Sequence, residues 1–200
     1  MEGRIAIGGD RALLDHVARP DVALAIWWRR MPEALRLALG GLDLTGVDDM
    51  AVEVDLNGSV DAALTAAGYE GAVQRLLCAD IDLLIRRHAA LTGEDRQRVR
   101  LEVIASEPVS RFRADRTTFG LRCTYVGPGI QWCRIDGPDA IYEVPAGAVG
   151  VFKGRALLDQ PVILHRSPSV EASRLVLAID PAHDETSDRS RRIVPAADPC

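Results

Sequence analysis

The sequence has few aromatic residues, no paired cysteine motif and no long apolar run. Only 4% of its 200 residues are aromatic, although 48% are hydrophobic. No apolar run approaches the roughly 20 residues of a membrane-spanning helix, and the N-terminal MEGRIAIGGDR lacks the uninterrupted apolar core of a signal peptide. The four cysteines show no CxxC spacing, and a disulfide framework is not expected in a chain of this length. They are Cys78, Cys123, Cys133 and Cys200. We therefore expect a cytoplasmic protein without a membrane partner.

An excess of basic charge is also missing. The formal net charge is -5, and the isoelectric point calculated from the sequence is near 5.4. The arginines are scattered, with short clusters at residues 29–30, 86–87 and 191–192. Nucleic acids require a concentrated basic face, so they are not expected as partners.

The first half of the sequence is dominated by helical periodicity. Apolar residues recur at helical spacing from Gly71 to Leu91, and Gly93 follows as the terminating residue. Shorter helices are predicted from Pro32 to Leu39 and from Ser59 to Gly68. Asp80 falls in or beside the apolar stripe of the long helix, where we expect it to accept hydrogen bonds from an arginine or a backbone amide.

From Val99 onward the period changes to two, which indicates short strands separated by Gly and Pro turns. After the first of them, strands are expected at Arg111 to Arg116, Thr118 to Val126, Ala140 to Val144, Ala148 to Phe152, Pro161 to Arg166 and Arg174 to Ile179. We predict an α+β fold, in which a helical N-terminal part packs on a C-terminal double-stranded β-helix, a jelly roll of the cupin kind. The expected parts are a flexible N-terminus (1–20), a mainly helical part (21–95), the β-roll (96–180) and a disordered tail (181–200). Residues 21–180 should form one compact unit.

Four residues have the order of a double-stranded β-helix metal site. Such sites combine an HxD pair, a second His about fifty residues later and an Arg some ten residues beyond. Asp115, His165 and Arg174 fall in these places, but Arg113 stands where the first His is expected. Two His and one carboxylate hold Fe(II) in such a site, and the late Arg pairs with a carboxylate of the co-substrate. A guanidinium has no lone pair for a metal.

Three interpretations of these residues stay open. Arg113, Asp115 and Arg174 form a buried salt-bridge network with His165 beside it, or they line a pocket for a metal or a small anionic ligand. In the pocket, Asp115 and His165 bind Fe(II) or Zn(II), and Arg113 and Arg174 bind the anion. In a third arrangement, Cys123 joins Asp115 and His165 in a zinc site. We expect Tyr125 and Trp132 to contribute to ligand binding. No GxSxG, Walker or GxGxxG motif is present, so no catalytic residue is assigned.

Five blocks of the sequence together resemble an uncharacterised bacterial family of unknown function. The blocks are AIWWRRMPEAL, FRADRTTFGLRCTYVGPGIQW, GAVGVFKG, ILHRSP and SRLVLAID. The family pattern is F-H-x-D, then R-L-L-C-T-Y-x-G-P-G-T-E-W-L-P, then H-R-S-P and R-L-L-x-x-D. Asp115, Cys123, Trp132, His165 and Arg174 match it. Arg113, Ile130-Gln131 and Cys133-Arg134 depart from it.

The resemblance implies an accessory role near zinc homeostasis, with a metal-chaperone protein as a partner. A more distant resemblance to Fe(II) and 2-oxoglutarate oxygenases implies an oxygenase-like β-roll. The leading hypothesis is accordingly a cytoplasmic bacterial protein whose β-roll pocket binds a metal or a small anionic ligand. The alternatives are an Fe(II)/2-oxoglutarate-dependent oxygenase, and a non-catalytic interaction module with a degenerate metal site.

Overall fold

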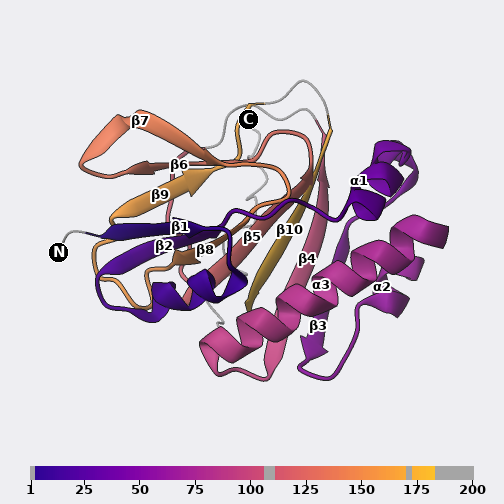
Figure 1. Ribbon diagram of the computed structural model, residues 1–200, viewed down its shortest axis with the longest axis horizontal. Coiled ribbons are helices and arrows are strands. Elements are labelled where there is room, and N and C mark those ends of the chain that lie inside the picture. Colours follow the sequence, from indigo (N-terminus) through magenta and orange to yellow (C-terminus); the bar gives the residue numbers. More distant parts are fainter. Residues whose placement is uncertain (1–2, 106–110, 170–172, 183–200) are drawn as a thin grey trace, which may run out of the picture.

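Two β-sheets and a layer of helices make up the described part of the chain (Figure 1). The computed structural model describes residues 3–105, 111–169 and 173–182. The predicted disordered tail lies outside the described residues from 183 onward, whereas Pro181 still belongs to the last strand. No helix within the described residues is long and apolar enough to cross a membrane.

The larger sheet has seven strands in the order β1-β2-β8-β5-β10-β4-β3. β1 and β2 pair in parallel, and the other neighbours are antiparallel. In that order the strands are Arg4–Gly8, Val22–Trp27, Val149–Lys153, Phe119–Val126, Arg174–Pro181, Arg96–Ile104 and Met50–Asp55. The smaller sheet has the order β7-β6-β9. Its strands are Gly137–Val144, Ile130–Arg134 and Ile163–Arg166.

The helices lie mostly on one side of the larger sheet. The long helix α3 (Gly71–Thr92) ends at Gly93, which has a left-handed φ of 71°. This confirms the helix predicted from periodicity, because glycine adopts such a conformation without the cost of a Cβ. The shorter helices are α1 (Glu33–Gly40), α2 (Asp61–Ala66) and the 3-10 helices η1 (Arg11–Ala18) and η2 (Leu44–Gly46).

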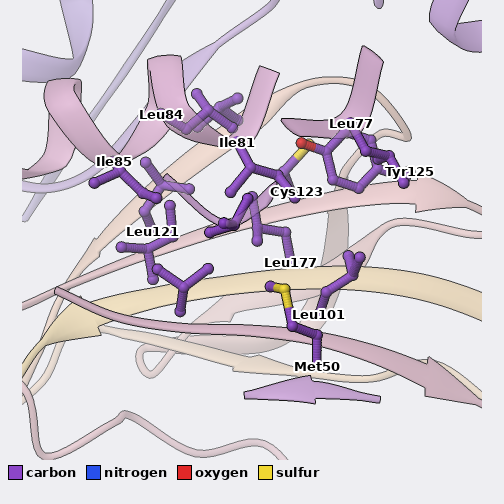
Figure 2. Packing of buried hydrophobic residues seen from close by; sticks show 14 of the residues in the cluster. Met50, Leu77, Ile81, Leu84, Ile85, Leu101, Leu121, Cys123, Tyr125 and Leu177 are labelled. Atoms are coloured by element: carbon purple, nitrogen blue, oxygen red, sulfur yellow. The ribbon is translucent and has the colours of Figure 1, made fainter. Parts of the chain in front are cut away.

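Alternation along the central strands separates two hydrophobic cores. In β10, Leu175, Leu177 and Ile179 join the core beneath α3, while Val176 and Ala178 face the opposite side of the sheet. Successive residues of a strand point to opposite faces, so each strand supplies both cores. Figure 2 shows the core beneath α3, where Leu77, Ile81, Leu84 and Ile85 meet side chains from the sheet. The second core fills the space between the two sheets.

The predicted division of the N-terminal half is not what the structure shows. Residues 1–20, predicted as flexible, contain β1 and η1. Within the mainly helical part 21–95, the apolar run at Val22 to Trp28 and the alternation at Met50 to Leu56 favour strands, and these are β2 and β3, which join the larger sheet. These strands bury apolar residues against segments more than 40 residues away in the sequence, as the pairing of β2 with β8 and of β3 with β4 shows. The chain is thus a mixed α+β protein made mostly of β-sheet.

A buried ion pair links the N-terminal part to α3. Arg29, just after β2, donates to both carboxylate oxygens of Asp80 at 2.6 and 2.7 Å, and the Tyr125 hydroxyl donates to the same carboxylate at 2.7 Å. Burial alone would lower the pKa of Arg29, but the hydrogen-bonded Asp80 more than offsets this and raises it. The expectation that Asp80 accepts hydrogen bonds from an arginine is confirmed.

Candidate functional site

A pocket of about 640 Å³ opens on the face of the larger sheet opposite α3. It is lined by residues of β4, β5, β9 and β10 and by the segments around residues 113–117 and 155. Charged side chains dominate its lining. The arginines are Arg100, Arg113, Arg116, Arg122, Arg155 and Arg166, the acids are Asp49, Glu102, Asp115 and Asp180, and His165 completes the set.

Asp115 lies at the centre of the charged contacts. Its Oδ2 accepts a hydrogen bond from Arg122 Nη2 at 2.6 Å, and His165 Nε2 lies 3.2 Å from the same oxygen. Arg113 Nε is 3.8 Å from Oδ1. Burial alone would raise the pKa of Asp115, but Arg122 and His165 outweigh it and hold the pKa well below its usual range. The sequence prediction that residues 113, 115 and 165 lie together therefore agrees with the structure.

Arg122 ties Asp115 to a second buried carboxylate. Its Nη2 is 2.9 Å from Asp180 Oδ1, and Arg100 reaches Asp180 Oδ2 at 3.1 Å. The side chains of Arg122 and Asp180 are only 9% and 4% exposed. Burial would lower the pKa of Arg122, yet Asp180 and Asp115 raise it. Arg100, Arg122, Asp115 and Asp180 thus form a continuous chain of ion pairs along the pocket, which Glu102 extends at Arg100 and Arg113 extends at Asp115, each at 3.8 Å.

The backbone holds Asp115 and His165 close together. Residues 111–116, predicted as a strand, form a single antiparallel bridge in which Arg113 and His165 exchange hydrogen bonds of 3.0 and 2.8 Å. The amide of Arg155 donates to the carbonyl of Asp115 at 2.8 Å. Backbone hydrogen bonds thereby hold the segments that carry His165 and Arg155 against the segment that carries Arg113 and Asp115.

Gly154 permits this close backbone approach. A Cβ at this position would lie 1.9 Å from the carbonyl oxygen of Thr117. We expect Gly154→Ala to displace the Asp115 and Arg155 segments and to lower the free energy of unfolding by about 1–3 kcal/mol, as measured by urea unfolding. Gly137→Ala is the matched control, because a Cβ there meets nothing within 4 Å. Equal stabilities of the two variants would contradict the prediction.

Cys123 and Tyr125 do not belong to this pocket. Both lie on the opposite face of β5, in the core beneath α3 (Figure 2). Burial raises the pKa of Cys123 to about 11, so its sulfur is a thiol and a poor metal ligand. The zinc site of Cys123 with Asp115 and His165 is therefore wrong, because Arg122 takes the pocket face of β5 and Cys123 the other.

Arg174 and Trp132 lie near the pocket but do not line it. Arg174 is fully buried, and its Nε donates to the carbonyl of Pro128 at 2.8 Å. The predicted role of Arg174 in binding a ligand carboxylate does not fit this placement, since the side chain supports the turn at residues 127–129. Trp132 stacks on Tyr142 with ring centroids 4.5 Å apart. It packs in the core between the sheets.

The residues present do not fit the metal that the fold resemblance implies. An Fe(II) or Zn(II) site in a protein ordinarily has at least three ligands. Across residues 3–105, 111–169 and 173–182, no group of three or more His, Cys, Asp or Glu side chains could hold a metal ion. Asp115 and His165 supply two, and Arg122 already occupies Oδ2 of Asp115.

Arg122, Arg100 and Asp180 were not predicted from the sequence as residues of the site. A signal was present, because Arg122 interrupts the apolar run of β5 and a buried arginine needs an acidic partner. Its partner could not be identified, since Asp180 comes 58 residues later and meets Arg122 only through the pairing of β5 with β10.

Comparison with solved structures finds similarity at low sequence identity. A rice dioxygenase for auxin oxidation is 14% identical, with 90% of this chain and 83% of that chain covered and a TM-score of 0.49. A Pseudomonas putida prolyl-4-hydroxylase is 16% identical, with 85% and 96% covered and a TM-score of 0.49. A cupin-2 domain-containing protein from Shewanella frigidimarina is 12% identical, with 42% and 70% covered and a TM-score of 0.31.

The search of curated proteins finds no match. A family model does match, and it covers residues 8–180, which include the whole pocket. This agrees with the resemblance seen in the sequence blocks. The chain therefore belongs to the family described as "Protein of unknown function (DUF1826)".

Proposed function

We propose that this protein is a cytoplasmic small-molecule-binding protein whose pocket takes a small anionic ligand. The observation that supports this most directly is the concentration of arginine in the pocket. Six arginines and four acidic residues line it, an excess of two positive charges (6 - 4), whereas the whole chain has a net charge of -5. A positive cleft in a negative protein attracts anions and rejects cations.

Four of the six arginines show the difference between groups held by the protein and groups open to a ligand. Arg100 and Arg122 are engaged by the buried aspartates. Arg113 is 68% exposed and approaches Asp115 only at 3.8 Å. The Arg155 side chain is exposed and forms no hydrogen bond or ion pair with a described residue. Arg113 and Arg155 therefore have donors to offer a ligand, and a guanidinium binds carboxylate or phosphate in a bidentate manner.

The size and lining of the pocket suit a small molecule. Its volume of about 640 Å³ falls within the roughly 300–1,000 Å³ of typical ligand sites. Ile130, Val176 and Ala178 provide apolar surface beside the charged groups. We infer a ligand with one or two acidic groups on a short carbon skeleton. His165, which is buried, and Arg166 also line the pocket.

Binding of anions by the purified protein tests the proposal. Calorimetry would compare succinate, 2-oxoglutarate and phosphate with butyrate, which matches succinate in length but lacks one carboxylate. We expect the dianions to bind more tightly than butyrate. Arg113→Gln and Arg155→Gln should each weaken binding about tenfold, since a hydrogen bond to a charged group contributes about 1.5–3 kcal/mol. Arg36→Gln is the control, because Arg36 lies on α1 and pairs with Glu33.

The alternatives give different results in the same experiments. An Fe(II)/2-oxoglutarate-dependent oxygenase would consume 2-oxoglutarate when Fe(II) is added. A non-catalytic interaction module would bind none of the anions. The family resemblance also implies an accessory role in zinc homeostasis with a metal-chaperone protein as partner, so Zn(II) belongs in the panel. Unchanged anion affinity in both arginine variants would contradict the proposal.

A further inference from the structure

Positions 113, 115 and 165 together have the arrangement that a three-ligand metal site needs. The bridge between Arg113 and His165 sets these residues directly opposite each other. Asp115 follows two residues after Arg113, and its Oδ2 lies 3.2 Å from His165 Nε2. A complete three-ligand site would have a histidine at position 113, where this chain has an arginine.

Arg122 is the second feature in which this arrangement differs from a metal site. Its guanidinium Nη2 is 2.6 Å from the carboxylate oxygen of Asp115 that also faces His165. The side chain of Arg122 is 9% exposed, and Asp180 holds its Nη2 from the other side at 2.9 Å. This cation is therefore fixed, and it cannot swing away into solvent as an exposed arginine could.

We propose that Arg122 is a built-in cation that takes the place of a divalent metal ion at Asp115 and His165. This inference deepens the proposed function, because it rests on the same pocket and states that anion binding there needs no metal. Arg122 acts as a positioning residue: it orients Asp115, and through Asp115 it orients His165.

The charges of the network support this assignment. Arg100 and Arg122 balance Asp115 and Asp180, and the longer contacts add one further charge of each sign, Arg113 and Glu102, so these ion pairs are neutral as they stand. A divalent ion bound to Asp115 would add two positive charges beside the guanidinium of Arg122, whose side chain is only 9% exposed. The repulsion between these positive charges opposes metal binding.

His165 is also committed within the network. Asp115 remains ionised, so the contact of 3.2 Å requires Nε2 of His165 to carry the proton and donate it. A protonated ring nitrogen has no lone pair for a metal. The positive charges of Arg113 and Arg155 then remain for the anionic ligand.

The absorption spectrum of bound Co(II) tests the inference independently of activity. The variants are Arg113→His, which restores the third ligand, and Arg113→His/Arg122→Met, which also removes the fixed cation. We expect no bound Co(II) in the wild type or in Arg113→His. The double variant should gain Co(II) affinity on the order of 100-fold, with visible ligand-field bands that disappear when His165→Ala is added.

Arg113→His/Arg122→Lys is the matched control, since lysine keeps the charge but not the forked shape, and it should bind no Co(II). Co(II) binding by Arg113→His alone would overturn the proposal, because Arg122 would then not block the site. A folded Arg113→His/Arg122→Met variant that still binds no Co(II) would also overturn it. If the Arg113→His/Arg122→Met variant does not fold, the wild type and Arg113→His still test the proposal. Co(II) binding by either protein contradicts it, and the absence of Co(II) binding in both supports it.

Anion titrations with and without EDTA separate this inference from the proposed function. Succinate affinity that is unchanged by EDTA agrees with both. Succinate binding that requires a metal would overturn the role of Arg122 but leave the anion pocket intact. No anion binding, together with the expected Co(II) results, would contradict the proposed function and leave the role of Arg122 standing.

Discussion

Arg29→Met is expected to lower the free energy of unfolding by about 3–5 kcal/mol, because it leaves the carboxylate of Asp80 buried without its cation. The side chains of Arg29 and Asp80 are 7% and 5% exposed, so water cannot replace the lost partner. Both Nη atoms of Arg29 contact Asp80, and its Nε donates to the carbonyl of Gly147 at 2.9 Å. The variant therefore loses the link between β2, α3 and the turn before β8.

Urea unfolding monitored by circular dichroism gives the free energy for the wild type and the variants. Arg36→Met is the control, because Arg36 forms an exposed pair with Glu33 and such pairs contribute little. In Arg29→Met/Asp80→Asn the buried charge is removed, so we expect part of the lost stability to return. A loss of less than about 1 kcal/mol in Arg29→Met would contradict the expectation that the buried pair of Arg29 and Asp80 stabilises the fold.

The same ion pair shows what periodicity can and cannot predict. Asp80 interrupts the apolar stripe of α3, and this alone indicates a hydrogen-bonding partner. The partner is Arg29, 51 residues earlier in the sequence. Nothing local distinguishes Arg29 from its neighbour Arg30, because the choice depends on where β2 enters the larger sheet. A local pattern thus predicts that a partner exists, and only the tertiary structure selects it.

Strands could be predicted from the sequence where alternating apolar and polar residues are flanked by turn residues. β5, β8, β9 and β10 lie within one or two residues of their predicted positions. β6 was missed: Gly127-Pro128-Gly129 was interpreted as a turn, and no strand was assigned to Ile130 to Arg134 after it. β1 was missed because its five residues, RIAIG, form a short edge strand whose pairing with β2 supplies the stability that its own sequence does not.

The site was predictable in part. The spacing of Asp115 and His165 indicated that they meet, and they do. Strand parity could have excluded Cys123, because Leu121, Cys123 and Tyr125 form the apolar face of β5 while Arg122 and Thr124 form the other. The network of Arg100, Arg122 and Asp180 requires the antiparallel register of β4, β5 and β10, which pairs Asp180 with Arg98 and Ile179 with Leu121. Sequence periodicity contains no information on register between distant strands.

That network is the basis of the second large effect. We expect Arg122→Met to lower the free energy of unfolding at neutral pH by about 3–5 kcal/mol. It removes the shortest ion pair of Asp115, which keeps His165 and the exposed Arg113, and it leaves Asp180 with Arg100. Urea unfolding at pH 7 measures this cost. Arg122→Met/Asp115→Asn removes the uncompensated carboxylate as well, so the double variant should be more stable than Arg122→Met.

The cost of Arg122→Met should also shrink as the pH falls. In the wild type the pKa of Asp115 is held well below its unfolded value, so the ionised carboxylate contributes stability above pH about 4, and this contribution is lost as the pH falls below that point. Without Arg122 the pKa of Asp115 rises, because burial then opposes the charge with less compensation. The variant therefore has less stability to lose on acidification. The difference between wild type and variant should be largest at pH 7 and clearly smaller at pH 3. A difference that is independent of pH would mean that the cost comes from packing and not from the charge that Arg122 compensates.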